Sequence, residues 1–553
     1  MRSVGLLCLL AIFPTAALAQ VPNSCDLPRD IDKYQLLRRL SLDLRGQVPT
    51  YAEYEALEAQ QSIPVTTIGS YLASEGFRQT MRRYHEEALW PNVSNIAISN
   101  VNAILSLRTP TEPALSISSL GRRTLFRGDA LVNTVTHGEQ CGDYEQTNFL
   151  DGGTFAPDPA FIYSETTTFA DGGSRTVYQE GWRWVTPYWD PTTPVRVCAY
   201  DAQETLSTSI GPATVGCDSY LTNGRKECGC GPNLEYCYFG TVSRVVLASL
   251  REQLNRSVDD VAVNGQPYTD LLLGTKAYVN GPINQWRKTL SNNLSLSRIY
   301  AVADSQEQLA LKAFTDTSFS QVNRGKLPNG TEFHAGVTSL PAYLLKFQTG
   351  RARANRFRMD FMCESFVPPA TLTAEAGCKD NTTELTQRCY CQSCHKTLEP
   401  LAAYWGQFTE AGTTMMTDLA IFPRQRASCV GSGNAFCQRF YVTVPGSDRA
   451  GALIPYQYAE KTSVDPYRKA AGDNIELGPR ALAQQIINDG TFARCTAKRV
   501  FRYFVKRDMH IAGAESEEAE LLEQLSSGFE GSGYQLPWLV EQVVSLPQYR
   551  RIR

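Results

Sequence analysis

The stretch CYCQSCHK, residues 389–396, is the one around which we expect the rest of the chain to be organised. Within it, Cys391, Cys394 and His395 form the pattern C-x-x-C-H, which is typical of a covalently attached c-type haem. Two intervening residues let one helical turn place both thiols along one edge of the porphyrin. The imidazole of the next residue then reaches the iron from the same side. We therefore predict haem c at this site, with His395 as the proximal iron ligand.

The same residues allow other interpretations. Cys389 lies close to the motif, and a C-x-x-C pair can also form a disulfide or bind zinc. We favour haem over these alternatives because of the compartment that the N-terminus indicates.

The first twenty residues have the pattern of a signal peptide. Arg2 supplies a positive charge, residues 6–13 form an apolar run, and Ala17-Leu18-Ala19 makes an A-x-A cleavage site. The run is too short to span a bilayer, and we expect no transmembrane segment after cleavage. The protein is therefore predicted to be periplasmic, or secreted to the cell surface. Haem c is attached outside the cytoplasm in bacteria, so the two predictions support each other.

Composition limits the partners and the redox state. The net charge is −3 and the pI is near 6.1, which gives no sign of a nucleic-acid partner. Of the 16 cysteines, fifteen follow the cleavage site, and two used by haem leave an odd thirteen. We expect several disulfides and at least one unpaired thiol. Cys429 with Cys437 is the favoured pair, whereas Cys228 and Cys230 suggest either a redox or metal pair or, more typically, structural cysteines.

The alternation of helical and strand-like patterns predicts a mainly α protein with β-rich insertions, in which a helical scaffold surrounds the haem module. The predicted order is a signal peptide (1–19), an N-terminal helical module (20–120), a β-rich, Cys-containing insertion (121–241), a helical module (242–362), the haem c module (363–412), a second β-rich insertion (413–472) and a C-terminal helical module (473–553).

Several helices have specific signals. Leucines at helical spacing predict a helix over 31–46 that stops at Gly46, and Thr50 with Glu53 makes a capping box for the next helix. Further helical runs cover 68–90 and, after a loop, one long helix within 334–361. That helix carries an arginine series that would pair with haem propionates or form a solvated face. The series is Arg351, Arg353, Arg356 and Arg358.

The insertions have strand signals. Asp-Gly-Gly turns at Asp151 and Asp171 separate β-prone runs, including 174–178 and 182–186, and the second insertion has a strand-like run at 439–444. A group of aromatic residues in the first insertion would contact carbohydrate or, as we prefer, pack within the sheet. These residues are Trp182, Trp184, Tyr188 and Trp189.

The sixth iron ligand decides the chemistry. Met415 or Met416, about twenty residues after the motif, are the first candidates, because methionine is the ligand of many electron-transferring haems c. The remaining candidates are His334, Met509 and His510, each more typical of a structural role. His85 is interpreted as a partly exposed helix histidine.

Several segments resemble, in order, the large planctomycete-type cytochrome c proteins, which are built of domains of unknown function. The similarity covers about half of the chain and is carried by LLRRLSLDLRGQVPTYAEYEAL near the start, PYTDLLLGTKAYVNGP at 267–282, the segment 334–363, CQSCHKTLEPLAAYWGQFTEAG at 391–412, and FARCTAKRVFRYFVKRDM with YQLPWLVEQVVSLPQYRR near the end. This chain departs from the family at Glu399-Pro400, where Asp-Pro is usual. The resemblance implies a mostly helical, exported haem protein.

Two classes of function remain open. One is electron transfer to or from a redox partner protein. The other is an enzyme or binding protein, either a haem-dependent oxidoreductase with an open iron position or a polysaccharide-associated hydrolytic or binding protein. No carboxylate pair stands out as a hydrolytic dyad.

Overall fold

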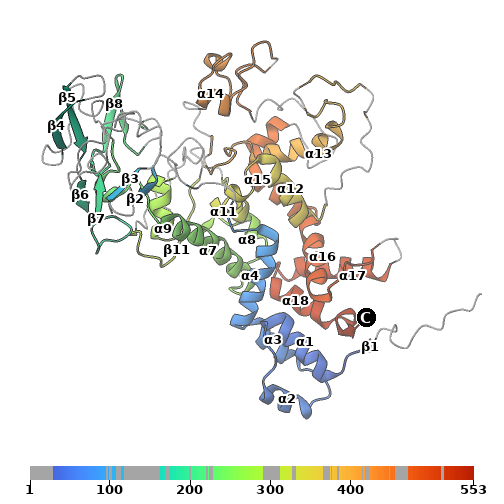
Figure 1. Cartoon of the computed structure of the whole chain (residues 1–553). Helices are drawn as coiled ribbons and strands as arrows, with labels where there is room; N and C mark the ends of the chain where they lie inside the picture. The colour runs from blue at the N-terminus through green and yellow to red at the C-terminus, as the bar shows by residue number, and fades with distance from the viewer. Residues whose placement is uncertain are drawn as a thin grey trace, which may run out of the picture.

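The computed structural model describes residues 29–552 with internal gaps. The main gaps are 95–97, 99–102, 108–113, 118–161, 169–173, 219–221, 223–227, 291–311, 365–373, 417–421, 455–470 and 512–515. The predicted signal peptide, Cys141 and the turns at Asp151 and Asp171 lie outside the described residues. Among the described residues helices predominate over strands, and most of the strands lie at one side of the molecule (Figure 1).

The N-terminal helices follow the predicted signals closely. They are α1 (Lys33–Arg45), α2 (Tyr51–Glu58), α3 (Val65–Leu72) and α4 (Glu75–Leu89). Helix α1 ends at Gly46, whose φ of 71° is the left-handed conformation that glycine adopts without strain. Thr50 and Glu53 form the reciprocal hydrogen bonds of a capping box at the start of α2. The expected run 68–90 is divided because Ser74 caps a new helix, α4.

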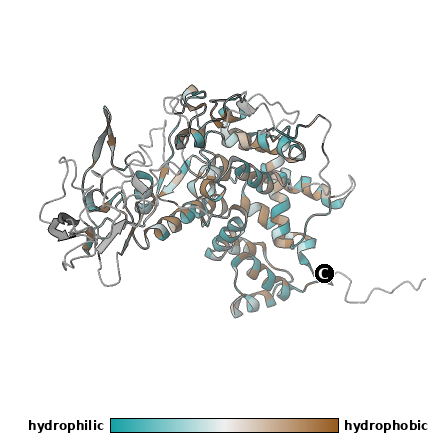
Figure 2. Ribbon diagram, turned by 45° about the horizontal axis from the view of Figure 1, so that its top comes forward, coloured by the Kyte–Doolittle hydropathy of each residue, from teal (hydrophilic) through white to brown (hydrophobic). Residues whose placement is uncertain are grey.

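The centre of the molecule is built on one long helix. This helix is α7 (Val242–Ala262). The other elements of this part are α8 (Asp270–Leu273), α9 (Gly281–Gln285), the π-helix η5 (Trp286–Leu290) and the antiparallel pair of β10 (Lys276–Val279) and β11 (Ser320–Asn323). Arg82 on α4 donates to Asp259 and Glu252 on α7, at 2.5 Å for the closest contact. The apolar faces of these helices join one continuous core. In Figure 2 the helices carry both apolar and polar residues, as expected for amphipathic helices that pack on a core.

The strands form small sheets. One has the order β2-β3-β7-β6 and combines Leu105–Leu107, Ala114–Ile117, Val195–Cys198 and Trp182–Val185. Two hairpins join β4 (Ile162–Thr168) with β5 (Ser174–Glu180) and β8 (Ser207–Ile210) with β9 (Ala213–Gly216). A short 3-10 helix, η4 (Pro232–Leu234), follows. Strands β2 and β3 precede residue 121, so the sheet also uses chain from the segment predicted to be a helical module.

The second half returns to helix and closes on the N-terminus. Its elements are η6 (Gly336–Ser339), α11 (Pro341–Lys346), α12 (Gly350–Phe357), η7 (Arg358–Met362), α13 (Gln392–Ala402), η8 (Ala403–Trp405), η9 (Ala427–Cys429), α14 (Ala435–Phe440), α15 (Ala471–Asn488), α16 (Thr491–Val505), α17 (Glu517–Gly531), α18 (Leu536–Ser545) and α19 (Pro547–Arg550). Strand β12 (Arg551–Ile552) pairs antiparallel with β1 (Arg29–Asp30), which brings the two ends of the described chain together.

Two expectations are wrong. The segment 334–361 is not one long helix, because the chain leaves the helical conformation at Phe347 and Thr349 caps a new helix, α12. In the described parts of 413–472 there is no strand, only isolated bridges such as Tyr441 with Leu453. The run 439–444 fails as a strand because the Asn434 side chain caps α14, which takes up Arg439 and Phe440.

Five disulfides brace the described chain. They are Cys217–Cys228, Cys230–Cys237, Cys363–Cys495, Cys378–Cys389 and Cys429–Cys437. The favoured pair, Cys429–Cys437, is confirmed. Cys228 and Cys230 bond to different partners, so the structural interpretation of these two cysteines holds. Disulfides of this number are typical of proteins from oxidising compartments.

Candidate functional site

The C-x-x-C-H motif forms the first turn of α13. The backbone N–H of His395 donates to the carbonyl of Cys391 at 3.0 Å, and that of Cys394 donates to the same carbonyl at 3.2 Å. The disulfide Cys378–Cys389 fixes the chain just before the motif. The motif therefore has the single helical turn that the spacing predicts.

The two motif cysteines differ from the other described cysteines. Eleven of the thirteen described cysteines are disulfide-bonded: ten form the five disulfides given above, and Cys198 takes part in a further one. The two exceptions are Cys391 and Cys394, which are free, partly exposed thiols. Cys391 and Cys394 are both free in this structure, so they do not form the alternative disulfide. Two accessible thiols one turn apart remain available for covalent attachment.

The imidazole of His395 is oriented by a buried carboxylate. His395 Nδ1 lies 2.6 Å from Glu399 Oε1, four residues later on α13, and Arg351 Nε donates to the same oxygen at 2.6 Å. Only 5% of the Glu399 side chain is exposed. Because Nδ1 is engaged by an acceptor, it carries the proton, and the lone pair of Nε2 is directed away and able to bind a metal.

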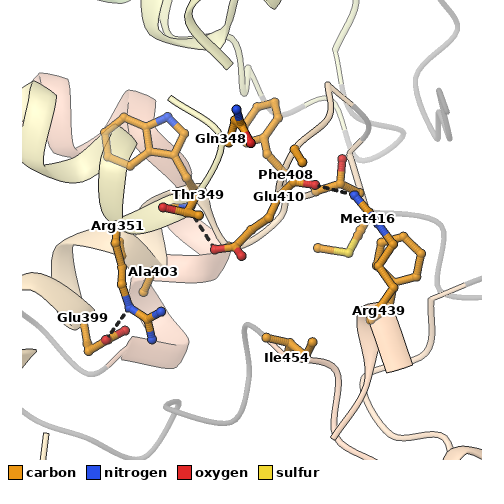
Figure 3. A pocket seen from close by; sticks show the side chains of 17 residues that line it. Gln348, Thr349, Arg351, Glu399, Ala403, Phe408, Glu410, Met416, Arg439 and Ile454 are labelled. Carbon is orange, nitrogen blue, oxygen red and sulfur yellow. Dashed lines mark hydrogen bonds and ion pairs between the residues drawn. The ribbon is translucent and has the colours of Figure 1, made fainter. Parts of the chain in front are cut away.

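A cavity of about 480 Å³ lies beside α13, within the size range of cofactor sites (Figure 3). Its walls come from α12, α13, η8, the loop after η8, and α14. From α13 and η8 it receives Glu399, Ala402 and Ala403, which lie four, seven and eight residues after His395 and so share its helix face. Cys391, Cys394 and His395 themselves do not line the cavity but lie next to it in the first turn of α13. The small alanine side chains leave this wall open.

The structure separates the two candidate methionines. Met416 lines the cavity, and its thioether points toward the middle of it (Figure 3). Met415 instead pairs with Phe408 in a β-bridge and belongs to the main apolar core. Side chains of consecutive extended residues point in opposite directions, which explains the difference. Met416 is therefore the one of the pair that a ligand in the cavity would meet.

Only one member of the predicted arginine series faces the cavity. Arg351 lines it, whereas Arg356 donates to the carbonyl of Glu87 at 2.9 Å and forms an ion pair with Asp360, and Arg358 pairs with Glu364. Arg353 is fully buried, and burial lowers its pKa to about 10. The expectation that the series acts together, as a propionate partner or as a solvated face, is therefore wrong for Arg353 and Arg356.

Sequence reasoning missed three residues of this site. Arg439 lines the cavity from α14, and Glu410 lines it from the loop, where it accepts from the N–H of Gly350 at 3.1 Å. Glu399 was noted only as a departure from a family pattern. Its spacing of four residues from His395 was the signal available in the sequence, because i and i+4 side chains meet on a helix.

The remaining candidate ligands lie elsewhere. His85 is buried rather than partly exposed, and its Nδ1 and Nε2 contact Met81 O at 2.7 Å and the Tyr268 hydroxyl at 2.9 Å. Burial lowers its pKa to about 4, so it is a neutral core residue. His334 and Met509 are also buried away from the cavity wall, and His510 is exposed.

The aromatic residues of the first insertion have different surroundings. Tyr188 packs edge-on against Trp189 and Phe314, and its hydroxyl donates to the carbonyl of Cys237 at 3.1 Å. Trp184 is 59% exposed. For Tyr188 and Trp189 the packing interpretation is therefore the better one, and the aromatic residues do not share one surface.

Among the residues that the structure describes, no group of three or more His, Cys, Asp or Glu side chains is placed to hold a metal ion by itself. No described helix combines the length and apolar character needed to cross a membrane. Comparison of the chain with protein-family models, with curated proteins and with solved structures gives no match.

Proposed function

We propose that this chain is an exported c-type cytochrome with a single haem, and that it transfers electrons to or from a redox partner protein in the periplasm or at the cell surface. The observation that carries this proposal is the state of the cysteines. In a chain whose other described cysteines are oxidised, the two free thiols are those of the C-x-x-C-H motif, one turn from an imidazole whose Nε2 is free.

The residues of the site fit a haem c. Cys391 and Cys394 would supply the two thioether bonds, and His395 Nε2 the proximal ligand. The adjacent cavity has apolar walls at Trp405, Phe408 and Phe440 and two guanidinium groups, of Arg351 and Arg439, that suit carboxylates such as haem propionates. A bound haem supplies a one-electron Fe(III)/Fe(II) couple.

The chain's own residues would hold and shield this group. The Cys378–Cys389 disulfide and the helical turn fix the thiols, and Glu399 holds the imidazole ring in one orientation. The Met416 thioether on the cavity wall is the proposed sixth ligand. A methionine ligand would favour electron transfer over reaction at an open iron position, which is why we place this function ahead of a haem-dependent oxidoreductase.

Mass spectrometry and spectroscopy of the mature chain test the proposal. Expressed in a host that attaches haem c, the wild type should carry one covalent haem and give a reduced-minus-oxidised spectrum of the c type. The double variant Cys391→Ala/Cys394→Ala should lose covalent haem. The matched control, Cys429→Ala/Cys437→Ala, removes a disulfide outside the motif and should retain it.

Three results would contradict parts of the proposal. A wild-type chain without haem, and with a bond between Cys391 and Cys394, would remove the cytochrome assignment. Binding of carbon monoxide to the reduced wild type would instead indicate an open iron position and favour the oxidoreductase. A c-type spectrum in the double variant would place the attachment elsewhere.

A further inference from the structure

Glu399 has no role in covalent attachment, but its buried oxygen contacts both His395 and Arg351. Glu399 Oε1 is 2.6 Å from His395 Nδ1 and 2.6 Å from Arg351 Nε, and 5% of its side chain is exposed. A buried carboxylate costs free energy unless it is paired and hydrogen-bonded, and here one oxygen serves two donors.

We propose that Glu399 is a positioning residue that lowers the reduction potential of the haem, by holding the proximal imidazole through Nδ1. This inference rests on the proposed function. A carboxylate acceptor on the second ring nitrogen increases the electron donation of the first nitrogen to a metal, and outer partners of this kind tune metal sites. A stronger donor stabilises the oxidised, more positive iron relative to the reduced iron.

The fold fixes Glu399 in this position. His395 and Glu399 are four residues apart on α13, so their side chains lie on one face. The next residue, Pro400, cannot donate a backbone hydrogen bond, but its carbonyl accepts from the buried Asn474 side chain on α15 at 2.7 Å. On the other side, a Cβ at Gly350 would lie 3.2 Å from the carbonyl of Ala402, so α12 packs closely on α13 and brings Arg351 to Glu399.

Arg351 completes the arrangement. Its guanidinium balances the charge of the buried carboxylate, and a charge-assisted bond of this kind is shorter and stronger than a neutral one. The hydrogen bonds to Arg351 and His395 therefore hold the Glu399 side chain against the ring. The carboxylate is shared between His395 and Arg351, so its effect on the imidazole is partial.

The cavity offers a matched control. Glu410 also lines it, but it accepts from the N–H of Gly350 and does not contact His395. Removing its charge therefore tests for a general electrostatic effect of a carboxylate near the haem. Removing the charge of Glu399 makes the same change in charge and also alters the hydrogen bond to His395.

The test measures midpoint potentials of the full-length holoprotein. Glu399→Gln keeps the size of the side chain and should raise the potential by an amount equal to at least a threefold change in the reduction equilibrium, or about 28 mV at 59 mV per tenfold for one electron. Glu410→Gln should change it by less than half as much. Glu399→Asp, which keeps the charge on a shorter side chain, should lie between Glu399→Gln and the wild type.

A second measurement reports the iron–histidine bond itself. In a Met416→Ala background, the iron–histidine stretching frequency of the reduced protein should fall when Glu399 is also replaced by Gln. Equal potentials in Glu399→Gln and Glu410→Gln, with an unchanged stretching frequency, would overturn the role of Glu399 while leaving the cytochrome assignment intact. Absence of covalent haem in the wild type, seen before any potential is measured, would overturn both. If Glu399→Gln does not fold, Glu399→Asp decides the question by the same two measurements.

Discussion

At the scale of single residues, Met415 and Met416 show how neighbours in sequence acquire different roles. Met415 is 4% exposed and packs in the main core, while Met416 is 7% exposed and borders the cavity. Burial alone does not distinguish them. The β-bridge between Met415 and Phe408 does, because it fixes which side chain of the pair turns toward the cavity.

Substitution of each methionine by alanine should therefore have a different effect. Met416→Ala should remove the proposed sulfur ligand, change the visible spectrum of the oxidised holoprotein and lower the reduction potential, since methionine raises it. Met415→Ala should leave the spectrum unchanged but lower the free energy of unfolding by about 3 kcal/mol, the usual cost of truncating a buried methionine. Spectra and denaturant titrations of both variants check this, and an unchanged spectrum in Met416→Ala would remove the ligand assignment.

At the scale of elements, the break between α11 and α12 is held by a buried arginine. Arg353 Nε donates to the carbonyl of Phe347 at 2.8 Å, and its Nη2 donates to Leu344 at 2.9 Å and to Thr409 and Gly412 at 3.0 and 3.1 Å. The first two carbonyls end α11, and the last two belong to the loop that carries Glu410 into the cavity. One side chain therefore satisfies carbonyls from the helix break and from a cavity wall.

Arg353→Met should remove the hydrogen bonds that connect the helix break to the loop at 409–412. Methionine fills part of the space but leaves the buried carbonyls without a donor, so we expect the free energy of unfolding to fall by about 3–4 kcal/mol. The control is Arg502→Met on α16, whose side chain is 70% exposed and whose loss should change stability by less than about 0.5 kcal/mol. Chemical denaturation measures both, and equal losses in the two variants would show that the Arg353 hydrogen bonds do not stabilise the fold.

At the scale of the whole molecule, the disulfide Cys363–Cys495 joins the chain before the motif to the C-terminal helices. It links the end of η7 to α16 across 132 residues of sequence, and the loop that it closes contains α13 and the part of the cavity lining that follows Cys363. Close by, the buried Asp360 on η7 accepts from Arg499 on α16 at 2.6 Å. The covalent bond and the ion pair together fix the C-terminal helices to the segment that precedes the site.

Removal of this disulfide should destabilise the protein more than removal of a short-range one. In the chain-entropy model, Cys363→Ala/Cys495→Ala should cost about 5 kcal/mol, whereas the Cys429–Cys437 bond, which closes 8 residues, should be worth about 2.5 kcal/mol. Thermal unfolding of the two double variants measures the difference. Equal losses would mean that the long loop is already restricted in the unfolded chain.

The sequence determined those features that depend on residues close together. The C-x-x-C-H turn, the Gly46 stop, the Thr50–Glu53 capping box and the Cys429–Cys437 pair all follow from local spacing, because each is formed within a few residues or one small loop. The mainly helical class follows in the same way from apolar periodicity. Haem attachment, export and electron transfer remain predictions from this pattern.

Only the tertiary structure decided which residues surround the motif. It selected Met416 over Met415, placed Arg351 and Arg439 on the cavity wall while burying Arg353, and showed that the helix of 334–361 breaks at Phe347 and that 439–444 is not a strand. The physical reason is that these choices depend on contacts between distant segments. A carbonyl of Thr409 or Gly412 that captures Arg353, or a bridge from Phe408 that turns Met415 inward, has no signature in the local sequence pattern.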